Sequence, residues 1–396
     1  MMRKIILLLL CSGLFGCSAV DTAKESMSGL YDYFSGGEDN AAPPTPLVEY
    51  KPELDVQVFW KESVGVGAEK QSLKLIPAIG SGKVIAADRE GTVQARDLKT
   101  GALLWEVETE LPFSGGPSLA AGRVILGTSK AEVVALNSEN GELQWKSKVS
   151  SEVLAVPVIA KGIVIVRTTA GEVVALDEKT GGRLWSYEHS VPALSIRGTG
   201  APLVIDDNVI IGYDNGKLVA LSLKNGKYVW EATIAMPKGR SEIERLVDLD
   251  VDPIETGGII YIASYNGGVS AISASDGEVL WRNEKVSSHT GLSYNSRHLY
   301  LSDSAGQVLQ IEQSRGAGLW KQTELSHRKL TAPALYQDYV VVGDYDGYVH
   351  WLSTRDGRLL GRIQITDSAI DAKPIIVDGV VYVYAKDGTL AALTAH

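Results

Sequence analysis

The sequence predicts an all-β fold, an eight-bladed β-propeller of four-stranded antiparallel blades. Three observations support this: a glycine-rich composition, an internal repeat of roughly forty residues, and a tryptophan that closes most copies of the repeat. The 396 residues include 41 Gly but only four Phe and four Met, a balance typical of short strands joined by many tight turns. With 45% apolar residues the chain can bury a large core, which excludes disorder for most of it.

Residues 1–16 have the order of a secretory signal peptide. A short basic start is followed by an apolar run that is too short to cross a bilayer as a mature helix. The run ends at residues 14–17, Leu-Phe-Gly-Cys, which resemble the bacterial lipobox. That resemblance implies that Cys17 is acylated and becomes the first residue of the mature chain. Ser18 stands where an Asp would mark inner-membrane retention, so the resemblance implies an outer-membrane lipoprotein that faces the periplasm.

Residues 17–54 are expected to form the lipidated cysteine and a flexible tether. They show no sustained hydrophobic periodicity and contain a Ser-Gly-Gly-Glu-Asp-Asn stretch at 35–40, followed by several prolines. Cys11 leaves with the signal peptide, so the mature chain has no second cysteine for an internal disulfide. The propeller is then expected to occupy residues 55–396.

The repeat is clearest in residues 131–145 and 171–185, which read AEVVALNSENGELQW and GEVVALDEKTGGRLW. Each copy contains short alternating strands separated by turn residues, and so small a sheet cannot bury both of its faces alone. Neighbouring sheets must therefore stack around an axis. The first small residue of the pattern recurs eight times, at Gly91, Ala131, Gly171, Gly216, Gly267, Gly306, Gly347 and Gly388.

A tryptophan near the end of the repeat is expected to fill the wedge between adjacent blades. The eighth repeat ends before reaching this position, whereas residues 56–61 alternate like an outer strand. We therefore expect the amino-terminal strand to complete the last blade, because two open blade edges would invite aggregation. Trp351 and Gln310 replace the alanine of other repeats, and we expect local repacking there. The blade-packing tryptophans are Trp60, Trp105, Trp145, Trp185, Trp230, Trp281 and Trp320.

The sequence offers little support for catalysis. The six His show no metal-ligand spacing, and Asp248, Asp250 and Asp252 fail as a calcium loop because Pro253 and Ile259 stand at the required Gly and Glu positions. No nucleotide-binding or serine-nucleophile motif is found. The formal net charge of −10 also argues against a nucleic-acid partner. We expect no metal, no cofactor and no enzymatic activity.

The motif Ala-Leu-Asp-x-x-Thr-Gly-x-x-x-Trp is similar to the repeat of pyrroloquinoline-quinone (PQQ) dehydrogenases, which are also eight-bladed periplasmic propellers. Those enzymes commonly place an adjacent Cys pair against the quinone, and a mature chain whose only cysteine is Cys17 cannot supply that pair. A quinone-dependent dehydrogenase remains the alternative function. A propeller that binds a small ligand or a cell-wall sugar in its central channel is the third.

The lipobox, the tether and the eight repeats together resemble the BamB family, the propeller lipoproteins of the outer-membrane β-barrel assembly machinery. The resemblance implies a non-catalytic scaffold that binds the periplasmic domains of the central barrel subunit, BamA. It also implies help with the delivery and insertion of outer-membrane proteins, so unfolded outer-membrane proteins are further candidate partners.

Two enlarged connections between blades are the candidate binding surface. They follow Trp185 and Trp230 and must emerge on the same face, one blade apart. Apolar residues lie among charges in both, which favours an interface over two solvated loops. We expect the site residues to be solvent-exposed, and either to contact a partner of alternating charge or to hold the two connections in a fixed relation. The BamB resemblance implies that the partner-binding residues are Leu194, Ile196, Arg197, Asp248 and Asp250.

Overall fold

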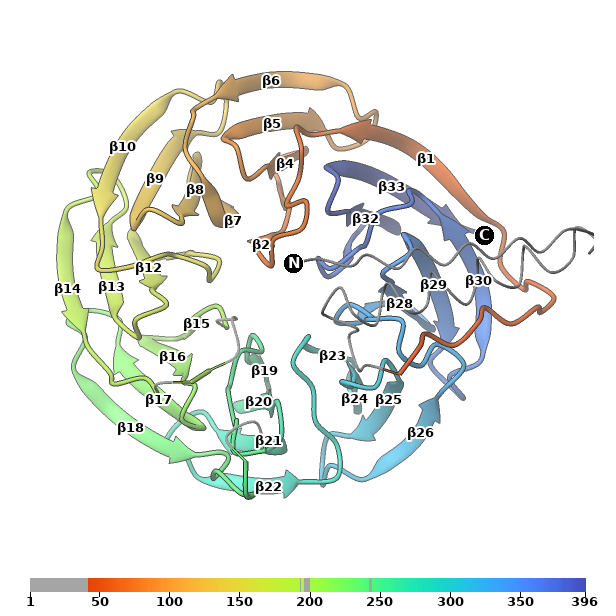
Figure 1. Ribbon diagram of the computed structural model, residues 1–396. Helices are drawn as coiled ribbons and strands as arrows, with labels where there is room; N and C mark the ends of the chain where they lie inside the picture. Colours follow the sequence, from red (N-terminus) through yellow and green to blue (C-terminus); the bar gives the residue numbers. More distant parts are fainter. Residues whose placement is uncertain (1–41, 193, 196–199, 242–243) are drawn as a thin grey trace, which may run out of the picture. The chain divides into compact units, whose positions relative to one another are not determined.

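The computed structural model confirms the eight-bladed propeller (Figure 1). It describes residues 42–192, 194–195, 200–241 and 244–396, and one compact unit spans Pro44–His396. The regular elements of these residues are strands, arranged as eight sheets around a central axis. Among the residues described, no helix has the length and apolarity needed to cross a membrane.

Each blade follows the chain from its inner to its outer strand. Blades 1 and 2 consist of β3 (Ala78–Gly80), β4 (Lys83–Ala87), β5 (Thr92–Asp97) and β6 (Leu103–Glu108), then β7 (Phe113–Ala120), β8 (Arg123–Thr128), β9 (Glu132–Asn137) and β10 (Leu143–Lys148). Blades 3 and 4 consist of β11 (Val158–Ala160), β12 (Ile163–Arg167), β13 (Val173–Asp177) and β14 (Arg183–Tyr187), then β15 (Leu203–Ile205), β16 (Asn208–Gly212), β17 (Lys217–Ser222) and β18 (Tyr228–Thr233).

The second half of the ring repeats this order. Blades 5 and 6 consist of β19 (Ile254–Thr256), β20 (Ile259–Ser264), β21 (Gly268–Ser273) and β22 (Val279–Asn283), then β23 (Leu292–Tyr294), β24 (His298–Ser302), β25 (Val308–Glu312) and β26 (Gly318–Gln322). Blade 7 consists of β27 (Ala334–Tyr336), β28 (Tyr339–Gly343), β29 (Tyr348–Ser353) and β30 (Leu359–Gln364). Blade 8 consists of β31 (Ile375–Val377), β32 (Val380–Tyr384), β33 (Thr389–Ala395) and, from the other end of the chain, β1 (Val56–Ser63).

The ring closes through strands from both ends of the propeller, as predicted. Strand β1 pairs antiparallel with β33, so that Val56 lies opposite Ala395 and Ser63 lies opposite Thr389. In Figure 1 the carboxyl terminus accordingly lies beside β1. A short additional strand, β2 (Lys74–Leu75), pairs parallel with β7 at the inner edge of blade 2. With β1 as its outer strand, the last blade has four strands, like the repeating unit of the other blades.

The predicted tryptophans lie between neighbouring blades, and each indole N–H donates to a backbone carbonyl of the next blade. The glycine of the Thr-Gly turn packs against the same ring: a Cβ at Gly181, where φ is +70°, would lie 2.6 Å from Cε3 of Trp145. The repeat therefore needs both residues together. The acceptors for Trp60, Trp105, Trp145, Trp185, Trp230, Trp281 and Trp320 are the carbonyls of Leu98, Ser138, Glu178, Leu223, Ala274, Gln313 and Thr354, at 2.8–3.3 Å.

Blade 7 lacks this tryptophan because blade 8 has no turn between its third and outer strands to receive it. Gly361 takes the position and lies opposite Trp351, which is fully buried. A Cβ at Gly361 would lie 2.9 Å from Cγ2 of Val56 and 3.3 Å from Cβ of Leu54, so these side chains occupy the wedge instead. Gln310 is also buried and donates two hydrogen bonds from its amide nitrogen. The expected repacking at both positions is confirmed.

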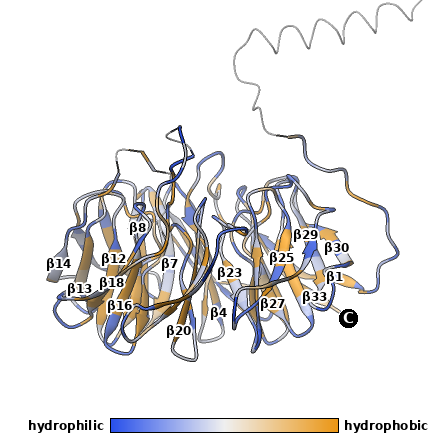
Figure 2. Ribbon diagram, turned by 90° about the horizontal axis from the view of Figure 1, so that it is seen from below, coloured by the Kyte–Doolittle hydropathy of each residue, from blue (hydrophilic) through white to orange (hydrophobic). Residues whose placement is uncertain are grey.

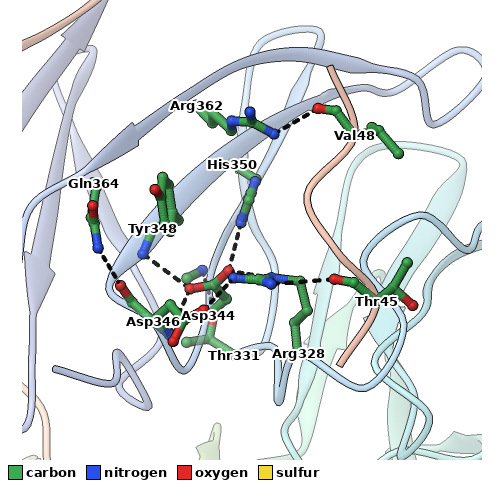
Figure 3. Close-up of polar contacts among 11 residues, drawn as sticks. Thr45, Val48, Arg328, Thr331, Asp344, Asp346, Tyr348, His350, Arg362 and Gln364 are labelled. Atoms are coloured by element: carbon green, nitrogen blue, oxygen red, sulfur yellow. Dashed lines mark hydrogen bonds and ion pairs between the residues drawn. The ribbon is translucent and has the colours of Figure 1, made fainter. Parts of the chain in front are cut away.

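Residues 44–54, which the sequence pattern assigns to the tether, instead pack along blade 7 and are called the strap below. The backbone N–H of Thr45 donates to the carbonyl of Ser326 at 3.0 Å, and Arg328 Nη1 donates to the carbonyl of Thr45 at 3.3 Å (Figure 3). Further along, Arg362 Nη1 donates to the carbonyl of Val48 at 2.9 Å. The strap therefore belongs to the same compact unit as the propeller.

A buried ion cluster holds the end of the strap at Thr45. Arg328 Nε lies 2.7 Å from Asp344 Oδ2, and His350 Nε2 lies 2.9 Å from the same oxygen (Figure 3). Arg328 is 3% exposed, and Asp344 and His350 are fully buried. Burial lowers the pKa of His350; burial also raises that of Asp344, but its hydrogen bonds and the charges of His350 and Arg328 hold the Asp344 pKa below its ordinary value.

Candidate partner-binding site

The two enlarged connections lie on one face of the ring, which we call the upper face. Chain direction alternates along each antiparallel blade, so the connections between blades and the turns between second and third strands share this face. The inner hairpins and the turns before the outer strands form the lower face. Figure 2 shows the blades side on, with apolar strands and more polar loops at both of their ends. Residues 188–202 join β14 to β15, and residues 234–253 join β18 to β19.

The end of the second connection packs against the ring, which corrects the expectation that its acidic residues are exposed. Asp248 and Asp250 are only 2% and 6% exposed. They alternate with Leu249 and Val251, which are buried too. The packing is close because Gly212 leaves room: a Cβ there would lie 2.8 Å from Cβ of Leu249. Residues 247–251 are therefore part of the core rather than of a solvated loop.

The first connection contributes an exposed apolar side chain. Leu194 is 48% exposed, as expected for a contact residue, whereas Ile196 and Arg197 lie outside the described residues. The connection then returns to the ring beside the second one. A Cβ at Gly200 would lie 2.7 Å from the carbonyl oxygen of Val251, so only glycine allows this approach.

One hydrogen bond joins the two connections, and Lys74 makes two further hydrogen bonds to the second connection. The backbone N–H of Ala201 donates to Asp252 Oδ1 at 2.7 Å. Lys74 Nζ donates to the same carboxylate oxygen at 3.3 Å and to the carbonyl of Asp250 at 3.1 Å. Because Lys74 belongs to β2, the short strand near the axis, the two connections are fixed to each other and to the channel wall.

A buried ion pair beneath the connections is not apparent from the sequence pattern. Arg167 Nη2 lies 2.8 Å from Asp214 Oδ1, and the two side chains are 1% and 5% exposed. Arg167 Nη1 also reaches the carbonyl of Gly200, at 3.5 Å, and its guanidinium lies 5.4 Å from the ring centroid of Tyr213. One feature of the sequence could have indicated this pair. Arg167 stands at the end of the second strand of blade 3, where blades 1, 2 and 4 have the small residues Ala87, Gly127 and Gly212.

Asp250 is the most perturbed carboxyl group of this site. Neither of its carboxylate oxygens has a hydrogen-bond partner among the residues that the structure describes. Burial, with the nearby charge of Asp214, raises the Asp250 pKa from 3.8 to about 7, against the opposing charge of Arg167. Near neutral pH this side chain therefore exists as a mixture of the protonated and the ionised form.

A histidine of the first connection, His189, packs against the same cluster. Within the described ranges, no group of three or more His, Cys, Asp or Glu residues could hold a metal ion. His189 packs against Tyr213 with ring centroids 4.1 Å apart and ring planes tilted by 32°, and burial lowers the His189 pKa. The imidazole is therefore neutral near pH 7 and packs as an aromatic ring.

The comparisons with known proteins agree with this architecture. A family model described as outer membrane protein assembly factor BamB matches residues 89–322 and 312–396. The outer membrane protein assembly factor BamB of Pseudomonas aeruginosa is 45% identical over 360 residues, which cover 91% of this chain and 94% of that protein. The crystal structure of BamB from Moraxella catarrhalis superposes with a TM-score of 0.78 at 27% identity, covering 86% of this chain and all of that one.

A more distant likeness concerns the fold alone. The quinohemoprotein alcohol dehydrogenase of Comamonas testosteroni matches with a TM-score of 0.67 at 15% identity, over 86% of this chain and 76% of that chain. At this identity the shared propeller carries no argument for a shared activity.

Proposed function

The chain belongs to the BamB family of outer membrane protein assembly factors, and on this premise we propose that it is a lipid-anchored scaffold that binds the periplasmic domains of BamA. Family membership is the observation that carries the proposal. It makes the chain a non-catalytic assembly factor associated with the outer membrane on its periplasmic side, and it does not favour the quinone-dependent dehydrogenase. The binding of BamA, the lipid anchor and assistance to nascent outer-membrane proteins are parts of the proposal.

The upper face supports the proposal because the described ends of its two long connections are joined to each other. The bond from Ala201 to Asp252 and the close approach of Gly200 to Val251 join the connections. The buried Arg167–Asp214 pair lies beneath them. A pre-organised surface loses little conformational entropy on binding, which favours affinity.

The site residues then divide into two roles. Leu194, which is half-exposed, supplies apolar contact to the partner together with Ile196, and Arg197 of the same connection supplies a charge that selects the partner surface. Asp248 and Asp250 are buried and hold the second connection in place rather than meeting the partner directly. Of the two roles that the sequence leaves open for these carboxylates, their burial favours the positioning one.

The lipid anchor is placed at Cys17, upstream of the strap, in this proposal. The strap itself begins at the upper face, where Thr45 bonds to Ser326 in the connection after blade 6. Acylation of Cys17 would attach the chain to the membrane. The acyl chains, and not the acidic propeller, would supply the membrane affinity.

The proposal is tested by measuring the affinity of the purified propeller for the BamA periplasmic domains. Leu194→Asp should weaken binding roughly tenfold or more, because it places a charge in an apolar contact. Its melting curve should stay unchanged, because exposed residues alter stability by about 0.5 kcal/mol or less. Glu139→Ala and Lys179→Ala, in turns of the lower face, are the matched controls. Normal binding by Leu194→Asp, or equal loss in the controls, would refute the site.

A further inference from the structure

The axial channel contains a cavity of about 610 Å³ that the proposed scaffold function does not use. Each of the eight blades contributes to its wall, through the residues at which the chain enters the inner strands from the upper face. Its volume lies within the range of small-molecule sites, roughly 300–1,000 Å³. Most of the lining is apolar, as Leu75, Ile254, Leu292, Leu335 and Ile376 exemplify.

Four charged side chains reach this apolar wall, and three of them have an ionic partner. Lys74 pairs with Asp252 at 3.3 Å, and Asp371 pairs with Lys386 at 3.6 Å. Lys373 forms no ion pair with any described residue. Its ammonium donates one hydrogen bond, to the carbonyl of Leu292 at 2.9 Å, which leaves two of its three donors unused.

The surroundings of Lys373 disfavour its uncompensated charge. Burial lowers the pKa of its ammonium, and the Asp252 carboxylate, already engaged by Lys74, opposes that shift only from a distance. A convergent polar group with a perturbed pKa in an apolar cavity is the usual signature of a ligand site. A ligand that brings its own negative charge would neutralise Lys373 where the wall does not.

We propose that the channel binds a small amphipathic organic anion, with its carboxylate or sulfonate on Lys373 and its aliphatic or aromatic body against the inner strands. The apolar wall selects a ligand with an apolar body, and the unpaired ammonium of Lys373 selects a ligand with a negative charge. Lys74 would not serve in this role, because Asp252 and the carbonyl of Asp250 already occupy it. The site is distinct from the partner contact at Leu194, so the proposal does not rest on BamA binding.

The test uses the whole propeller with its strap, residues 44–396, and the aryl sulfonate 1-anilinonaphthalene-8-sulfonate as probe. We expect saturable binding at one site per chain. Lys373→Met should weaken it at least about tenfold, or about 1.4 kcal/mol, the order of a hydrogen bond to a charged group. Lys373→Arg should retain binding. Lys161→Met, which removes a lysine that donates to the carbonyl of Asp206 in a lower-face hairpin, is the control for net charge and should leave binding unchanged.

Competition then establishes which part of the ligand is recognised. Octanoate should displace the probe, whereas octylamine, with the same chain and the opposite charge, should not. Circular dichroism of each variant establishes that the fold is retained. Unsaturable probe binding, equal affinity in Lys373→Met, or equal displacement by octylamine would each overturn the proposal.

Discussion

Substitution of Asp250 by Asn should remove a pH dependence of stability that the fold builds into the partner site. Burial raises the pKa of Asp250 from 3.8 to about 7, so between these values the folded protein holds a proton that the unfolded chain has lost. The free energy of unfolding of the wild type therefore falls as pH rises from about 4 to about 7 and levels off above about 7. The raised pKa corresponds to at most about 4 kcal/mol, at 1.36 kcal/mol for each pH step of one.

The Asn variant keeps this position neutral at every pH. Its amide resembles the protonated carboxyl in size, so the two proteins should have similar unfolding free energies at about pH 3.5, where the wild-type carboxyl is protonated in both the folded and the unfolded state. At pH 8.5 the variant should be the more stable by a few kcal/mol, because it avoids an ionised carboxylate in a buried site. The measurement is urea unfolding of both proteins across this range.

The difference between the two proteins is the quantity to compare. His189, His289 and His350 have pKa values lowered by burial, so they make the folded state more stable as pH rises toward neutrality, and this contribution is common to both proteins. If Asp250→Asn retains the full pH dependence, or is less stable at pH 8.5, then Asp250 is ionised and compensated in the fold. That result would refute the reasoning.

Three further predictions concern the ring and its anchor. Trp60→Ala should lower the free energy of unfolding by about 3–5 kcal/mol, since Trp60 is only 8% exposed in the closing blade. Deletion of the chain before residue 62 should lower the melting temperature, and an unchanged melting temperature in the truncated protein would refute the closure. Arg328→Met should lower the free energy of unfolding, measured in urea, by about 3–5 kcal/mol, because it leaves Asp344 buried without its main cation. The same variant should be cleaved faster by proteases within the strap. A loss of stability no larger than that for an exposed arginine would contradict the buried cluster. Cys17→Ala should leave the protein unacylated and absent from the outer-membrane fraction, as checked by membrane fractionation and metabolic lipid labelling. A variant that is still lipidated would contradict the anchor.

The ring could be predicted from the sequence because its determinants repeat. The spacing of Trp145 and Trp185 reports the blade period directly, and the missing outer strand of the last repeat predicts the pairing of β1 with β33. The two departures from the repeat in blade 7 also compensate each other. The large Trp351 on the third strand lies opposite the small Gly361 on the outer strand.

The details of the site could not be predicted because they depend on contacts that do not repeat. The pairing of Arg167 with Asp214 joins two blades through residues at different positions of the repeat. Alternating charged and apolar residues at 247–251 suggest a half-exposed segment, yet Gly212 admits Leu249 so closely that both faces are buried. The strap is equally irregular in sequence, and only its bonds to blade 7 show that it is ordered.

Binding of BamA by the upper face is tested by site-specific photo-crosslinking in living cells. A photoreactive phenylalanine analogue replaces Leu194 on the upper face, or Glu139 on the lower face, in the full-length lipoprotein. We expect a crosslink to BamA from position 194 and none from position 139. Crosslinks to BamA from position 139 alone, or from neither position while the protein is present at its normal level, would contradict it.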